Sequence, residues 1–135
     1  MRRLLSLRHE DGQAAAEFAL VLPVLCAMVL AIAQFGIAFN NYLTITDAVR
    51  AGARVAAVSR FTADNGVAAK AAVLAAAPGL DQTKLDPLVL VTATPNWLSA
   101  GNTVSVTASY PYSINILGWV IQSGNVTSTT VERLE

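Results

Sequence analysis

The pattern of hydrophobic and polar residues divides the chain into one long apolar run, a segment of helical period and a set of alternating stretches. The apolar run extends from Phe18 to Phe39 and contains no charged residue. As a helix it would span about 33 Å at 1.5 Å per residue, enough for a hydrocarbon core of about 30 Å. The pattern therefore predicts a transmembrane helix, in which Pro23 should produce a kink.

The helical pattern continues beyond the apolar run, from Tyr42 to Ser59. Apolar and small residues recur there at intervals of three and four residues, which is typical of one buried helix face. These residues are Ile45, Val49, Gly52, Ala53 and Ala56. Asp47 precedes Arg50 by three residues, a spacing that favours an ion pair along the helix. We therefore expect one extended helix over residues 13–60.

A second helix is predicted from Thr62 to Ala77. Thr62 can cap its first turn, and Pro78 with Gly79 ends it. The expected apolar side of this helix contains Val67, Ala71, Leu74 and neighbouring alanines. The following segment, residues 80–87, is interpreted as a polar connection.

The last third of the chain has the composition of β-strands. Strands are predicted at Leu88–Thr94, Val104–Tyr110 and Val126–Leu134, of which the second alternates strictly between apolar and polar residues. Pro111 either ends the second strand or marks an edge of the sheet. The predicted fold class is α+β: a long N-terminal transmembrane helix continuing into a small domain, residues 61–135, with a second helix and an antiparallel sheet of about three strands.

One apolar segment, Ile114–Val120, fits this scheme less simply because Gly118 interrupts it. It is either a loop folded onto the core or a patch that contacts a membrane or a partner. For Trp119, a place in the core is the preferred interpretation.

Composition argues against several classes of function. The chain has 135 residues, and nine Lys and Arg balance nine Asp and Glu, so no concentrated basic face is available for nucleic acid. Cys26 is the only cysteine and lies in the apolar run, where it serves as a small apolar residue. His9 is the only histidine, and no glycine-rich phosphate loop follows a strand. We expect no enzyme activity, metal, cofactor or small-molecule substrate.

The N-terminus admits three interpretations. A secretory signal peptide would have a shorter apolar region, of about 7–15 residues. A simple signal anchor fits the length of the run. A prepilin-type signal fits as well, because it needs a short polar leader, a glycine before the cleaved bond and an acidic residue five positions after it. Met1–Gly12, Gly12 itself and Glu17 meet these three requirements.

Taken in order, these motifs resemble the TadE-like proteins, which are minor pilins or pseudopilins of the tight adherence (Flp, type IVc) pilus. The resemblance rests on Gly12-Gln-Ala-Ala-Ala-Glu17-Phe18, Leu22-Pro23, Gln34-Phe35-Gly36 and Arg50-Ala-Gly52-Ala-Arg54. It implies cleavage between Gly12 and Gln13 by a prepilin peptidase, and roles in subunit assembly for Glu17, Phe18 and Pro23.

Two positions depart from the family pattern. Glu10 and Asp11 precede Gly12, where relatives often have basic residues, and this bears on the efficiency of cleavage. Position 34 is Gln, where Glu is common, so a charge pair expected at that point cannot form.

The sequence leads to two functional hypotheses. The first is a minor pilin in the cytoplasmic membrane, with a cytoplasmic N-terminus, an extracytoplasmic C-terminal domain and possible incorporation into a pilus. Its partners would be the prepilin peptidase, other pilins, pilus-assembly membrane proteins and the lipid bilayer. Arg50 and Arg54 would contact lipid headgroups or an adjacent subunit, or else form a solvated helix face. The alternative is an uncleaved, signal-anchored envelope protein that binds and positions secretion or pilus components.

Overall fold

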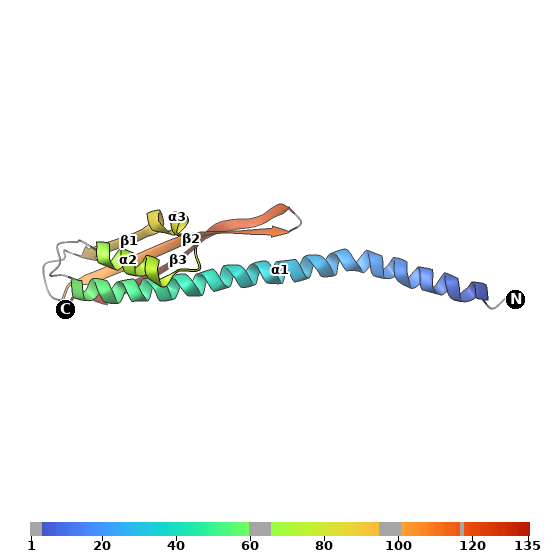
Figure 1. Ribbon diagram of the computed structural model, residues 1–135, viewed down its shortest axis with the longest axis horizontal. Helices are drawn as coiled ribbons and strands as arrows, with labels where there is room; N and C mark the ends of the chain where they lie inside the picture. The colour runs from blue at the N-terminus through green and yellow to red at the C-terminus, as the bar shows by residue number, and fades with distance from the viewer. Residues whose placement is uncertain (1–3, 60–65, 95–100, 117) are drawn as a thin grey trace.

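The computed structural model describes residues 4–59, 66–94, 101–116 and 118–135, with side chains from residue 12 onward. A single long helix carries a small domain on its C-terminal half (Figure 1). In chain order the elements are α1 (Leu4–Val58), α2 (Val67–Ala76), α3 (Gln82–Leu85), the 3-10 helix η2 (Asp86–Leu88), β1 (Val89–Thr94), β2 (Thr103–Ile116) and β3 (Trp119–Arg133). This arrangement confirms the α+β fold class.

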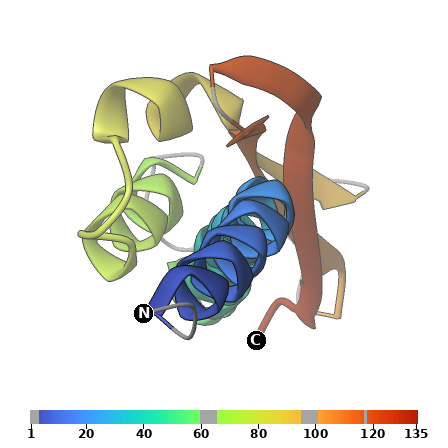
Figure 2. The ribbon, with the colours of Figure 1, turned by 90° about the vertical axis from the view of Figure 1, so that its right-hand side faces the viewer.

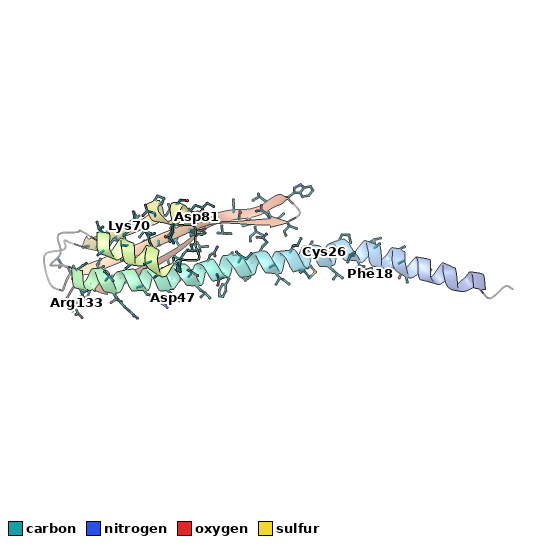
Figure 3. All side chains as sticks on the ribbon, in the orientation of Figure 1. Phe18, Cys26, Asp47, Lys70, Asp81 and Arg133 are labelled. Carbon is teal, nitrogen blue, oxygen red and sulfur yellow. The ribbon has the colours of Figure 1, made fainter. Side chains whose placement is uncertain are left out.

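The two halves of α1 have different surroundings. The helix has 55 residues, which corresponds to about 80 Å at 1.5 Å per residue. Its N-terminal half stands free of other elements, whereas its C-terminal half lies against α2 and the sheet (Figure 1). The helix passes through Pro23 without ending and bends in the region between Phe18 and Cys26 (Figure 3). Proline is the usual cause of such a bend, because it removes a backbone donor and crowds the preceding turn.

The C-terminal half of α1 supplies one wall of the hydrophobic core. All five residues predicted for its buried face are buried, and four of them have no exposed surface: Ile45, Val49, Ala53 and Ala56. Seen along the helix, α2 lies on one side of α1 and β3 on the other (Figure 2). The C-terminal half of α1 therefore contacts the domain on two sides, through α2 and through β3.

The sheet is antiparallel and three-stranded, as predicted, and its strand order is β1-β2-β3. Val104, Val106 and Ala108 point into the core, and the residues between them lie on the other face, so the period-two prediction is confirmed. β2 does not end at Pro111 but continues to Ile116. Pairing with β1 stops at Ala108, so Pro111 lies where that edge of β2 has no strand beside it and needs no ladder donor.

The segment Ile114–Val120 forms the far end of the β2–β3 hairpin and is not a loop folded onto the core. Gly118 has φ +89°, a left-handed conformation that glycine adopts without strain, and β3 begins at the next residue. The preferred interpretation of Trp119 was wrong, because its side chain is 78% exposed. The hairpin reaches well beyond α2 and β1, so no element is available to cover its end (Figure 1).

The second helix exists, but the prediction of its apolar side was only partly right. Leu74 is partly buried and packs against the core, and Ala69 and Ala77 are buried. Val67 and Ala71 are exposed, and Val73 is buried instead. Alanines at most positions of α2 make several faces equally apolar, so the contact with α1 selects the face. The helix starts after Gly66; the predicted cap, Thr62, lies outside the described residues.

The predicted polar connection is more ordered than expected, because it contains α3 and η2. Leu85 is fully buried, and Leu80 is nearly so. Asp81 caps α3: its carboxylate accepts hydrogen bonds from the Thr83 backbone N–H at 3.1 Å and the Thr83 hydroxyl at 2.6 Å. The hydrogen bond from the Thr83 hydroxyl is the main reason that the pKa of Asp81 lies below its usual value.

Candidate membrane helix and assembly site

The predicted cleavage site lies within the first turns of α1, and nothing in the fold explains the glycine there. A Cβ atom built on Gly12 would meet no atom within 4 Å. Gly12 is also not among the glycines with positive φ in the described part of the chain. Glycine costs about 1 kcal/mol relative to alanine inside a helix. No packing contact among the described residues accounts for this cost.

Glu17 lies one helical turn after Gln13 and already has a partner in the same chain. The Gln13 side-chain amide donates a hydrogen bond to Glu17 Oε1 at 3.0 Å, on an exposed surface. Such an i,i+4 contact is worth only a few tenths of a kcal/mol. It leaves the second carboxylate oxygen and all of the charge available to a stronger donor.

Phe18 and Pro23 lie on the part of α1 that nothing else contacts. The Phe18 side chain is 61% exposed, and Phe18 and Cys26 are both found where no other element runs beside the helix (Figure 3). The structure thus does not bring Glu17, Phe18 and Pro23 together with any described residue of the domain.

The exposed part of α1 has the length and composition of a membrane span. The candidate span is Gly12–Val58, and its most apolar 18-residue window has a mean hydropathy of 2.5 and is 0% buried within the chain. A core helix of a soluble domain would bury such a surface. An apolar surface of this extent needs lipid or other apolar helices around it. Membrane anchoring through α1 is therefore indicated.

An aromatic row lies on α1 where the bare part of the helix meets the domain. The ring centroids of Phe35 and Phe39 are 6.3 Å apart, and those of Phe39 and Tyr42 are 6.4 Å apart. The row forms one wall of an apolar crevice of about 260 Å³, and the β2–β3 hairpin forms the other. The lining residues are Phe35, Ala38, Phe39, Tyr42, Tyr112, Ile114 and Val126.

Arg50 and Arg54 are both exposed on α1, on either side of the buried Gly52. Arg50 Nη1 lies 3.2 Å from Asp47 Oδ1, which confirms the predicted pair. Both side chains of that pair are largely exposed, so it contributes little to stability. Arg54 has no ion-pair partner among the residues that the structure describes.

Gly52 has a role that the sequence did not reveal. A Cβ atom there would collide with Val73 Cγ2 and would lie 3.0 Å from the Ala69 carbonyl oxygen. The glycine therefore permits the close approach of α1 and α2. The periodic pattern could place Gly52 on the buried face, but only the contact with α2 shows why that position has no side chain.

In the described part of the chain, no three His, Cys, Asp or Glu side chains gather in a way that could hold a metal ion. The ion pairs there join residues on the surface, such as Lys70 with Asp86 at 3.2 Å and Lys84 with Asp81 at 3.4 Å.

Comparison with known proteins gives one match. The model of the family described as TadE-like protein matches residues 12–54. No curated protein and no solved structure matches the chain. The matched segment begins at Gly12, ends at Arg54 and includes every residue of the candidate site. Residues 12–54 are thus similar to TadE-like proteins.

Proposed function

We propose that this chain is a minor pilin of a tight adherence pilus. A prepilin peptidase cleaves it after Gly12, and α1 then packs beside the helices of other pilins. The observation that carries the proposal is the unexplained glycine at the start of the TadE-like region. Gly12 costs helix stability and meets no neighbour, so its value lies in recognition by another protein.

Lateral packing of α1 is supported by a second glycine of the same kind. A Cβ atom on Gly36 would also meet no atom within 4 Å, so this chain does not need the glycine for its own packing. Small residues on membrane helices allow the backbones of neighbouring helices to approach closely. With an apolar surface that is 0% buried, α1 has both the area and the site for such a neighbour.

Glu17 is the residue that we expect to set the register between subunits. Cleavage after Gly12 would create an amino group on Gln13, and this cation in one subunit would pair with Glu17 of the next. The intrachain hydrogen bond from the Gln13 amide is the weaker competitor, because it involves no positive charge. A shifted helix would leave both charges unpaired at the edge of the membrane, where a carboxylate is costly.

The test is assembly of a Glu17→Gln variant in the native host. This substitution keeps the shape of the side chain and removes its charge. We expect the variant to be inserted and cleaved but to lose co-purification with the other pilus components. Glu132→Gln is the matched control, since it makes the same change at an exposed position on β3. Normal co-purification of cleaved Glu17→Gln protein would refute the role of Glu17.

The membrane topology follows from the same proposal. Prepilin peptidases act on the cytoplasmic face, so residues 1–12 would lie in the cytoplasm. The domain on the other end of α1 would then be extracytoplasmic. Arg2, Arg3 and Arg8 agree with this orientation under the positive-inside rule.

The alternative of an uncleaved, signal-anchored protein is favoured by one observation. α1 runs without interruption from Leu4 through the bond between Gly12 and Gln13, and the hydrogen bond from Gln13 partly satisfies Glu17 in the intact chain. In that case α1 would remain a permanent anchor, and the domain would position other envelope components. The two functions predict different N-termini for the protein in the membrane.

A further inference from the structure

The end of the β2–β3 hairpin is apolar on both of its faces. Trp119, Val120 and Ile121 are 78%, 62% and 60% exposed, and they are consecutive residues of β3. Side chains of a strand point alternately to opposite faces, so Val120 faces away from the other two. A flat partner surface would cover only one face of the hairpin. A surrounding apolar medium would cover both.

The hairpin points along α1 toward the N-terminus of the helix, so its end approaches the membrane-spanning segment (Figure 1). The crevice shows which part of the hairpin lies beside which part of α1. Tyr112 and Ile114 of the hairpin line it together with Phe35 and Tyr42 of the helix. Ile116 lies two residues beyond Ile114, about 7 Å further along the strand. That distance corresponds to about four or five residues of a helix. The hairpin end is therefore beside the helical turn that precedes Phe35.

This position along α1 coincides with the C-terminal end of the predicted membrane span. A hydrocarbon core of about 30 Å that begins at Phe18 contains about 20 helical residues and ends near Ile37. The hairpin end thus overlaps the last turns of the span, at the depth where amphipathic elements lie in the interface, roughly 5–10 Å below the headgroups. Tryptophan is enriched at this depth, because its ring is apolar and its N–H can reach polar groups.

The rest of the hairpin limits how deeply it can enter. Exposed polar residues follow immediately after the apolar end, among them Asn115, Gln122 and Ser123. β2 has no strand beside it beyond Ala108 on the β1 side, and β3 is the edge strand of the sheet. Unpaired backbone groups of this kind are not tolerated in hydrocarbon. Only the end of the hairpin is therefore suited to contact with the lipid.

We propose that Ile116 and Trp119–Ile121 insert into the interface of the membrane that α1 spans. The helix and the hairpin then hold the domain at two points, which sets its orientation on the membrane and the depth of α1. The proposal rests on membrane anchoring through α1 alone. It does not depend on cleavage after Gly12 or on assembly into a pilus, and it holds on whichever side of the membrane the domain lies.

The experiment uses the full chain reconstituted in vesicles of phosphatidylcholine and phosphatidylglycerol. The chain has two tryptophans, so Trp97→Phe leaves Trp119 as the single fluorophore. The matched control, Trp97→Phe/Trp119→Phe/Val131→Trp, places the fluorophore at an exposed position near the other end of β3. Iodide on both sides of the vesicles reports exposure to water, and lipids brominated at different depths report contact with the bilayer.

We expect Trp119 to emit at shorter wavelength than the control fluorophore and to be quenched less by iodide. Lipids brominated near the headgroup end of the acyl chain should quench it more than those brominated near the chain terminus. Equal iodide quenching of the two fluorophores would overturn the proposal. Protection of Trp119 that disappears when the protein is diluted with excess lipid would also overturn it, because the end of the hairpin would then contact a second copy.

Discussion

Gly52 offers the sharpest test of how the domain is attached to the long helix. In the Gly52→Ala variant, the added methyl group would collide with Val73 Cγ2 and would lie 3.0 Å from the Ala69 carbonyl oxygen. The side chain of Val73 belongs to the fully buried core, and the carbonyl oxygen is part of the α2 backbone. The carbonyl oxygen cannot move without shifting α2 away from α1.

Two opposing effects determine how much Gly52→Ala changes the free energy of unfolding. Replacing a helical glycine with alanine favours the helix by about 1 kcal/mol. Overpacking a core by a methyl group typically costs about 1–3 kcal/mol. The net change in the free energy of unfolding is therefore a loss of up to about 2 kcal/mol. Because the helix-propensity effect is the same in any background, a double-mutant cycle with Val73→Ala isolates the steric effect.

The assay is urea unfolding of the full chain in detergent, followed by near-ultraviolet circular dichroism, which reports tertiary packing of the domain. We expect Gly52→Ala to be less harmful in the Val73→Ala background, with a coupling energy of about 0.5–3 kcal/mol. Gly36→Ala adds the same methyl group to the same helix where nothing lies within 4 Å, so the domain should unfold as in the wild type. A coupling energy of zero would refute the proposed contact between α1 and α2.

Two further predictions concern the domain. Val106→Asp would place an unpaired charge in the core and should lower the free energy of unfolding by about 3–5 kcal/mol. Thr107→Asp, on the other face of β2, should lower it much less. Equal losses of stability in urea unfolding would refute the assigned faces of β2. The pKa of Asp81 is lowered in the folded state, so this carboxylate contributes stability above its unfolded pKa and loses it as the pH falls through the folded pKa. The stability difference between the wild type and Asp81→Asn should therefore shrink on acidification, and a difference that grows would contradict the capping role.

The helices and strands of this chain could be predicted from sequence where the hydrophobic pattern was compatible with only one buried face. The length of the uncharged run defined the membrane span. The spacing of Ile45, Val49 and Ala56 defined the buried face of α1, because the charged residues Asp47, Arg50 and Arg54 mark the exposed side. The alternation of Val104, Val106 and Ala108 fixed the core face of β2 for the same reason.

The sequence did not predict burial where several faces of a helix were equally apolar. It also failed where the exposure of a residue depended on an element distant in the chain. Alanines made most faces of α2 suitable for burial, so only the contact with α1 decides that Val73 is inside. The exposure of Trp119 depends on how far the hairpin extends past β1, which the period-two pattern does not encode. The order in residues 80–87 arises from Leu85 and from the cap at Asp81, which are weak local signals.

The candidate assembly site was predicted as a set of positions, and the structure adds their surroundings. Glu17 and Phe18 are exposed on a part of α1 that no other described element covers, and Glu17 bonds only to Gln13 of the same helix in the described structure. The hydrogen bond between Gln13 and Glu17 was not predicted. Gln13 was expected to act through the backbone amino group that cleavage would create, and not through its side chain. No packing contact among the described residues accounts for Gly12, and its role as a processing site stays a prediction.

Cleavage after Gly12 can be tested by the intact mass of the protein extracted from membranes of its native host. Mass is preferable to N-terminal sequencing, because an N-terminal glutamine can cyclise and block the sequencing chemistry. We expect a mass that corresponds to 123 residues, Gln13–Glu135, since 135 − 12 = 123. A Gly12→Leu variant should remain full length in the same membranes. A wild-type mass that corresponds to a chain beginning at Met1 would contradict the account and favour a permanently anchored protein.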